Sequence, residues 1–239
     1  MLINSFSCSG LPNFESINKM NITDHDQPSV SYGIILLAAG ASSRLGKPKQ
    51  LLLYQGKTLL QHGMQEANGT GAKTIVIVLG ANADFLIKET ASQSIEVILN
   101  TEWNEGMASS IRCGINKLLE IAPGIDAAII MVCDQPYVTT KLLEDLVKKY
   151  QETGKPIIAS IYEDNQGTPA LFDKTIFASL LELKGDVGAK RIMKANPDLV
   201  ALVNFPLGNI DIDTEEDYNS LTPPKEGLKA TGFITDDSF

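Results

Sequence analysis

Short apolar runs alternate with segments of helical patterning along most of this 239-residue chain. Apolar runs that are brief and rich in branched side chains predict buried strands of a parallel sheet. These runs cover residues 33–39, 74–80, 95–100, 127–134, 156–162 and 199–205. The predicted helices cover residues 59–68, 85–91, 109–121, 140–154, 175–185, 188–196 and 215–221.

This alternation indicates one α/β domain with a mostly parallel central sheet and helices on both of its faces. We assign the domain to residues 32–221. Residues 1–31 and 222–239 have mixed composition without clear periodicity, so we expect them to be flexible extensions. In sheets of this kind, ligands bind at the carboxyl ends of the strands.

Composition and charge narrow the classes of function. The chain is 44% hydrophobic and 21% charged, with a net charge of −9. A nucleic-acid-binding protein usually carries a basic face, so we expect no nucleic-acid partner. No apolar run approaches the roughly 20 residues that span a bilayer, and the N-terminus lacks the pattern of a signal peptide. Three cysteines without a C-x-x-C pair indicate a reducing compartment, so we expect a cytoplasmic protein without a membrane partner.

The loop after the first strand combines small residues with three cations. The segment "AAGASSRLGKPK" (38–49) carries Arg44, Lys47 and Lys49. It is not a Walker loop, because its second glycine comes one residue late and Pro48 stands where a hydroxyl is required. Small residues let a ligand approach the backbone N–H groups, and Arg44 and Lys49 are suited to phosphate oxygens. A solvent-exposed basic loop is the alternative, and Lys47 fits either interpretation.

Acidic residues at two distant places are candidates for a metal site. Asp134 ends an apolar strand, where a carboxylate is costly unless it is paired or bound to metal. In "NIDIDTEEDY" (209–218), Asp211 and Asp213 lie on one face if the chain is extended. Mg²⁺ prefers oxygen ligands and needs only one or two carboxylates beside water and phosphate. Alternatively, these acids cap or open the helices that follow them.

The segment "LAAGASSRLGKPK" (37–49) resembles the opening signature L-A-A-G-x-S-x-R-x-G-x-x-K of enzymes that transfer a nucleoside monophosphate from an NTP. Five further segments extend the resemblance in order: "NTEWNEGMASSIRCGI", "CDQP", "GTPALF", "LKGDVGAKRI" and "DIDTEEDY". "LAAG" is most similar to the molybdenum cofactor cytidylyltransferase branch, whereas guanylyltransferases usually have "LAGG". The resemblance implies a Rossmann-like, three-layer α/β/α fold of the nucleotide-diphospho-sugar-transferase type.

It also implies an activity. CMP would be transferred from CTP to the terminal phosphate of molybdopterin cofactor, with Mg²⁺ bound and pyrophosphate released. A molybdenum hydroxylase would receive the product. Two alternatives remain open: the same fold using GTP or a sugar-phosphate acceptor, and a noncatalytic carrier of molybdenum cofactor.

The resemblance assigns roles to individual residues. The expected catalytic residues are Arg44, Lys49 and Asp134, and the expected metal ligands are Asp134 and Asp213, with Asp211 as a lesser candidate. The residues expected to contact the nucleotide are Leu37, Ala38, Ala39, Gly40, Arg44, Lys49, Asn100 and Ser110. Those expected to contact the acceptor are Gly167, Asp186 and Lys190. Thr168 departs from the family, which more often has histidine at that position.

Overall fold

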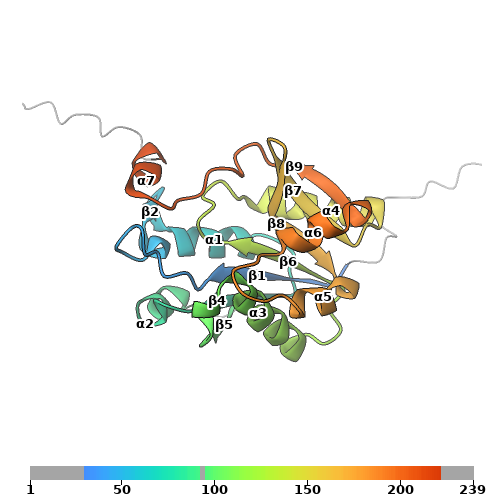
Figure 1. The fold of residues 1–239 in the computed structure, drawn as a ribbon, viewed down its shortest axis with the longest axis horizontal. Coiled ribbons are helices and arrows are strands. Elements are labelled where there is room, and N and C mark those ends of the chain that lie inside the picture. The colour runs from blue at the N-terminus through green and yellow to red at the C-terminus, as the bar shows by residue number, and fades with distance from the viewer. Residues whose placement is uncertain (1–29, 92–94, 222–239) are drawn as a thin grey trace, which may run out of the picture.

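The computed structural model describes residues 30–91 and 95–221 of the chain. Their centre is a seven-stranded sheet with the strand order β5-β4-β1-β6-β8-β7-β9 (Figure 1). The strands are β1 (Tyr32–Ala38), β4 (Thr74–Leu79), β5 (Ile95–Leu99), β6 (Ala127–Val132), β7 (Ile157–Tyr162), β8 (Asn165–Asp173) and β9 (Val200–Asn204). A two-stranded ribbon, β2 (Leu53–Tyr54) and β3 (Lys57–Thr58), stands apart from this sheet.

The central sheet is mostly parallel, as its apolar runs predict. The strand β1 pairs in parallel with both β4 and β6, β4 with β5, and β7 with β9. All residues of β1, and nearly all of β4 and β6, are buried, because helices cover both faces of these strands. The carboxyl ends of β1 and β6 therefore lie side by side at one edge of the sheet.

The strand β8 was not predicted, and it runs antiparallel to both β6 and β7. Its segment "NQGTPALFD" contains Gly167 and Pro169, two residue types that are depleted in strands. Neighbouring strands and the helices on both faces of the sheet bury β8. No local pattern of residues in this segment reveals that burial. Because β8 is reversed, its first residues lie at the same edge as the carboxyl end of β6.

Helices cover both faces of the sheet (Figure 1). One face packs against α3 (Met107–Ile121), α5 (Phe177–Leu181) and α6 (Lys190–Ala195). The other packs against α1 (Leu59–Asn68), α2 (Ala83–Leu86) and α4 (Thr140–Thr153). The last helix, α7 (Glu215–Leu221), lies beside β2, where the Tyr218 hydroxyl donates to the Leu53 carbonyl at 3.0 Å.

Local signals explain where the predicted helices begin and end. Thr58 and Gln61 form a capping box at the start of α1, which begins at the predicted residue. Gly154 ends α4 with φ of 62°, the left-handed conformation that favours glycine. The predicted helix 85–91 is instead α2 followed by a 3-10 turn, and the predicted helix 175–185 is shortened to α5 after a similar turn.

The ends of the domain agree only in part with the predicted boundaries. Most of 1–31, and all of 222–239, lie outside the described residues. Val30 packs against the core, however, and the Ser31 carbonyl accepts from the backbone N–H of Asp126 at 2.7 Å. Among the residues that are described, no helix combines the length and the apolar character needed to cross a bilayer.

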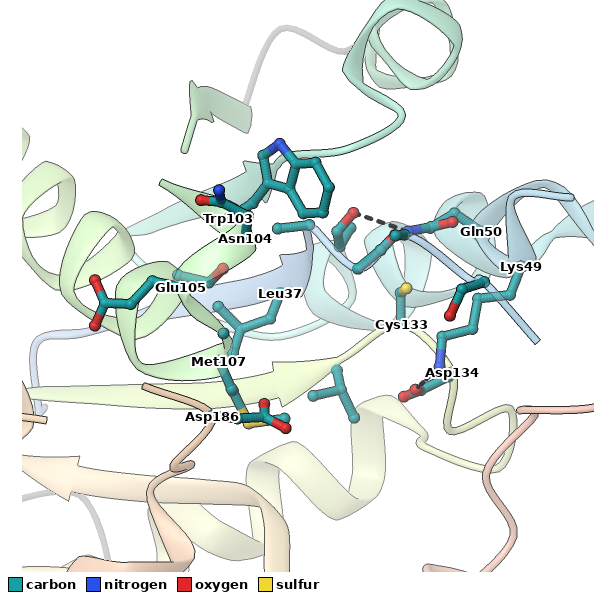
Figure 2. Close-up of a pocket in the computed structure, with 18 residues that line it drawn as sticks. Leu37, Lys49, Gln50, Trp103, Asn104, Glu105, Met107, Cys133, Asp134 and Asp186 are labelled. Carbon is teal, nitrogen blue, oxygen red and sulfur yellow. Dashed lines mark hydrogen bonds and ion pairs between the residues drawn. The ribbon is translucent and has the colours of Figure 1, made fainter. Parts of the chain in front are cut away.

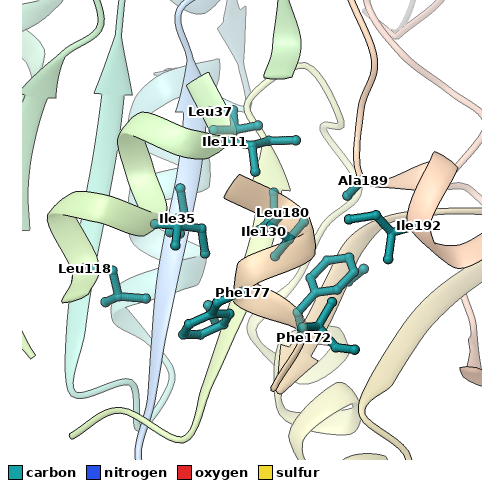
Figure 3. Close-up of a cluster of buried hydrophobic side chains, with 14 of the residues drawn as sticks. Ile35, Leu37, Ile111, Leu118, Ile130, Phe172, Phe177, Leu180, Ala189 and Ile192 are labelled. Atoms are coloured by element: carbon teal, nitrogen blue, oxygen red, sulfur yellow. The ribbon is translucent and has the colours of Figure 1, made fainter. Parts of the chain in front are cut away.

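A cluster of buried apolar side chains joins α3 and α5 to one face of the sheet (Figure 3). Ile35 of β1, Ile111 of α3 and Phe172 of β8 are fully buried in one continuous cluster of apolar side chains. Phe172 therefore fixes the unpredicted strand to the rest of the sheet. A buried aromatic ring of this kind contributes several kcal/mol, because its removal leaves a cavity.

We expect Phe172→Ala to lower the free energy of unfolding by about 3–5 kcal/mol, measured by urea denaturation. Phe85→Ala on α2 is the matched control, because that ring is 65% exposed. The control should change the stability by less than about 1 kcal/mol. Equal losses in the two variants would contradict the core position of β8.

Candidate active site

A cavity of about 570 Å³ opens beyond the carboxyl ends of β1 and β6 (Figure 2). This volume is within the usual range for small-molecule sites. Three segments and Asp186 form its wall. The lining residues are Leu37, Ala38, Ala39, Gly40, Ala41, Ser43, Lys49, Gln50, Trp103, Asn104, Glu105, Gly106, Met107, Ser110, Val132, Cys133, Asp134 and Asp186.

Two cations of the first loop meet two distant acids beside this cavity: Lys49 and Asp134 line it, whereas Arg44 and Asp213 lie outside its wall. The Lys49 ammonium donates to Asp134 Oδ2 at 2.5 Å and to Asp213 Oδ1 at 2.9 Å. Arg44 Nη2 donates to Asp213 Oδ2 at 2.9 Å. The structure thus brings together the four residues on which the predicted chemistry depends. Lys47 instead forms an ion pair with Glu215, outside the cavity wall.

The electrostatics of this cluster keep its charges in place. Burial opposes the charge of Lys49, but the negative charge of Asp134 and hydrogen bonds to Asp134 and Asp213 raise the pKa of Lys49 above its ordinary value. The same hydrogen bond from Lys49 lowers the pKa of Asp213. Desolvation, and then the charges of Asp134 and Asp213, raise the pKa of Asp211 to about 6. At neutral pH the cluster therefore holds an ammonium between carboxylates.

The second carboxylate oxygen of Asp134, Oδ1, is the atom that indicates whether a metal ion could bind here. Asp134 Oδ1 is buried and has no hydrogen-bond partner, which is costly for a carboxylate. Across 30–91 and 95–221, no group of three or more His, Cys, Asp or Glu side chains could enclose a metal ion. The free Asp134 Oδ1 is the kind of oxygen ligand that a Mg²⁺-like ion takes beside water and phosphate, whereas both oxygens of Asp213 accept from Lys49 and Arg44.

Cys133 lies in the cavity wall next to Asp134. Burial, and then the charge of Asp134, raise the pKa of the Cys133 thiol to about 12. The side chain is therefore a neutral, small wall residue, because only a thiolate is an effective nucleophile.

Gln50 is a wall residue that sequence reasoning missed. Its side chain is fully buried, and its amide donates to the carbonyls of Ala38 and Gly40 at 3.0 and 2.9 Å. A glutamine at the end of a polar loop gives no signal of burial, so only the folded loop reveals it.

The two nucleotide contacts predicted after β5, Asn100 and Ser110, differ in their position relative to the cavity. Ser110 lies in the cavity wall, but Asn100 does not. The Asn100 amide donates to the hydroxyls of Ser109 and Ser110 at 2.8 and 3.0 Å, and its oxygen accepts the N–H of Glu102 at 3.0 Å. Asn100 therefore holds the loop that leads into α3. Trp103 of the same segment, to which no role was assigned from the sequence, is 38% exposed and lines the cavity.

Arg112 and Glu105, which sequence reasoning also missed, fasten this loop to the turn that carries Asp186. Arg112 donates to both oxygens of Glu105, at 2.9 and 2.6 Å, and to the Leu183 carbonyl at 2.7 Å. Glu105 also accepts the N–H of Gly185 at 3.0 Å. These bonds, the side-chain bond from Arg112 first, lower the pKa of Glu105 to about 2, so it stays ionised at neutral pH.

Gly106 allows the same two segments to approach closely. Its φ is 119°, and a Cβ placed there would lie 2.6 Å from the Cα of Asp186. No residue but glycine combines this conformation with this contact. The Ala108 N–H then donates to the Gly185 carbonyl at 3.2 Å, so the start of α3 and the Asp186 turn pack as one unit.

Of the three residues assigned to the acceptor, only Asp186 lies in the cavity wall. Gly167 is buried in β8, paired with Ser160, and Lys190 is the first residue of α6. The neighbouring Thr168 also lies outside the wall, but its hydroxyl donates to Gln135 Oε1 at 3.2 Å. The start of β8 is therefore adjacent to the segment that carries Asp134.

Two relatives are similar in sequence to most of this chain. Nicotine blue oxidoreductase of Paenarthrobacter nicotinovorans is 29% identical over 207 residues, which span 83% of this chain and 96% of that protein. Probable molybdenum cofactor guanylyltransferase of Bacillus cereus (strain G9842) is 27% identical over 191 residues, 77% of this chain and 92% of that protein.

The fold is likewise similar to that of solved structures. The crystal structure of Rv0371c from Mycobacterium tuberculosis H37Rv has a TM-score of 0.70 and 28% identity, covering 81% of this chain and 98% of that chain. A complex of Rv0371c with manganese has a TM-score of 0.67 and 26% identity, covering 80% and 98%. The predicted fold class is confirmed.

A family model matches the part of the chain that forms most of the sheet and the cavity wall. Residues 34–200, more than half of the chain, match the model of the MobA-like NTP transferase domain. This match includes the loop with Arg44 and Lys49, the strand that ends before Asp134, and the Asp186 turn. The chain therefore belongs to the family of MobA-like NTP transferase domains, which are nucleotidyltransferases.

Proposed function

We propose that this protein transfers CMP from CTP to the terminal phosphate of molybdopterin cofactor and releases pyrophosphate. One observation carries the proposal: Arg44 and Lys49 meet Asp134 and Asp213 beside a cavity of small-molecule size. A noncatalytic carrier of molybdenum cofactor would have no use for this arrangement of two cations and two acids. The transferase domain would span residues 32–221, and the reaction would take place in the cytoplasm.

The cations would bind the triphosphate of CTP. Arg44 is 71% exposed, so it can turn from Asp213 to a phosphate group with little loss of packing. Lys49 is only 15% exposed and is held between the two acids. It would therefore offer a fixed positive charge at the phosphates, whereas Arg44 would close over them with its planar guanidinium.

Asp134 and Asp213 would hold the Mg²⁺ ion. The unpartnered oxygen of Asp134 supports this assignment, because a cation would satisfy it. When bound, the ion would neutralise phosphate charge and stabilise the departing pyrophosphate. The manganese complex of Rv0371c supports a divalent ion in a relative of the same fold.

The reaction requires no strong base. An oxygen of the acceptor's phosphate would attack the α-phosphorus of CTP, forming a new phosphorus–oxygen bond. The bond from the α-phosphorus to the oxygen that bridges it to the β-phosphate would break, and pyrophosphate would leave with that electron pair. A phosphate monoester is already largely anionic near neutral pH, so alignment and electrostatic stabilisation account for the rate.

Cytosine is the proposed base because Leu37 to Gly40 read "LAAG". These four residues line the cavity, and so does Ser110. GTP is the second candidate, since one relative is named a probable molybdenum cofactor guanylyltransferase. A sugar phosphate is the alternative acceptor, and a molybdenum hydroxylase is the proposed recipient of the product.

The proposal predicts pyrophosphate release only when a nucleotide and an acceptor are both present with Mg²⁺. CTP, GTP, UTP and ATP are each offered with molybdopterin cofactor or with a sugar phosphate, and pyrophosphate is measured. CTP with molybdopterin cofactor should give the highest rate.

Because another relative is named an oxidoreductase, oxidation of NADH and NADPH with a dye acceptor is assayed in parallel. Binding of the cofactor without pyrophosphate release would indicate a carrier.

We expect Asp134→Asn to lower kcat by at least about 10²-fold, the scale of losing a key electrostatic partner. The variant keeps the shape of the side chain but removes the charge that faces Lys49. Asp145→Asn is the matched control, since Asp145 lies on α4 outside the cavity wall. Circular dichroism checks that both variants fold. Near-normal turnover in folded Asp134→Asn would refute its role.

A further inference from the structure

Gln50 occupies an unusual position for a polar side chain. It is 0% exposed, yet it lies in the cavity wall directly after Lys49 (Figure 2). Burial of an amide costs free energy unless all of its hydrogen-bonding groups have partners. The partners of the Gln50 side chain belong to the last residue of β1 and the loop that follows it, which indicates that its burial serves that loop.

The amide nitrogen of Gln50 uses both of its hydrogens on this loop. It donates to the Ala38 carbonyl at 3.0 Å and to the Gly40 carbonyl at 2.9 Å, on either side of Ala39. In a trans peptide the carbonyl and the following N–H point in opposite directions. Holding these two carbonyls toward Gln50 therefore directs the N–H groups of Ala39 and Ala41 away from it.

Those two N–H groups are available to a ligand. Ala39 and Ala41 both line the cavity. Across 30–91 and 95–221, neither backbone N–H has an acceptor within the protein. Neighbouring N–H groups of a turn that face one cavity without internal partners form the kind of concave site that binds phosphate oxygens.

Ser42 links Gln50 to the backbone of Lys49. The Ser42 hydroxyl donates to Gln50 Oε1 at 3.4 Å and accepts the Lys49 N–H at 3.0 Å. Ser42 has φ of 55°, which is uncommon for a residue other than glycine. A strained conformation of this kind persists only where its surroundings hold it. The network therefore fixes the loop and the backbone that carries Lys49 together.

We propose that Gln50 is a positioning residue that presents the N–H groups of Ala39 and Ala41 to the triphosphate, an inference that rests on the proposed function. Gln50 does not itself touch the reacting atoms. Its amide holds the loop in a binding conformation before the nucleotide arrives, so less ordering is required on binding.

Two variants test this role. Gln50→Glu keeps the shape but faces the two carbonyls with an oxygen in place of the donor nitrogen, and Gln50→Met removes all hydrogen bonds while filling the space. Gln151→Glu is the matched control, because Gln151 is exposed on α4. Unfolding curves establish which variants fold, and at least Gln50→Met should, since it conserves volume.

The first measurement is hydrogen–deuterium exchange of residues 38–43 in the free protein. We expect faster exchange in the Gln50 variants and unchanged exchange in the control. The second is the affinity for CTP with Mg²⁺ by calorimetry, together with KM and kcat. The Kd and KM for CTP should rise at least about tenfold, the scale of one hydrogen bond to a charged group, while kcat falls much less.

The two proposals fail in different ways. Wild-type exchange in folded Gln50→Met, or wild-type affinity for CTP in that variant, would overturn the positioning role alone. Failure of the wild-type protein to bind any nucleoside triphosphate would overturn the proposed function and, with it, the phosphate role of the loop. A variant that lost stability but kept both the exchange pattern and the affinity would show that Gln50 serves only the fold.

Discussion

The ion pairs of Lys49 with Asp134 and Asp213 are the interaction on which the site depends. They join the loop after β1, the end of β6 and the segment before α7, three parts of the chain that are distant in sequence. Lys49 and Asp134 are mostly shielded from water, so either charge alone would be costly. The parallel sheet makes the pairing possible, because it places the ends of β1 and β6 next to each other. A ligand that carries phosphate and a divalent ion is complementary to this site, because phosphate pairs with the cations and the metal ion with the carboxylates.

Much of the fold could be predicted from the sequence, because the core strands are continuous apolar runs. Such runs are typical of strands covered on both faces, and β1, β4 and β6 are of this kind. The strand β8 could not be predicted, since its glycine and proline are acceptable only in the register set by its neighbours. The short helices near 85 and 175 were predicted too long, because local patterning does not show where a 3-10 turn replaces the α-helix.

Asp134 could be predicted because a charge next to an apolar strand end is conspicuous in a sequence, whereas Arg44, Lys49 and Asp213 were found through the loop composition and the family motifs. Positioning residues gave no such signal. Gln50 follows a polar loop, and Arg112 lies on a helix where an exposed arginine would be ordinary. Their importance comes from partners far along the chain, such as the carbonyl of Leu183 for Arg112. The assignments of Gly167 and Lys190 came from family resemblance, and neither residue reaches the cavity wall.

The reversal of β8 gives the sheet an edge at which some strands finish and another starts. Thr168, near its start, contacts Gln135, which directly follows Asp134. The residues before this contact, 165–167, pair with β7 and lie outside the cavity wall, so they can change without displacing the ion pairs of Lys49. The start of β8 can therefore vary while the parallel strands and the charged residues at their ends stay in place.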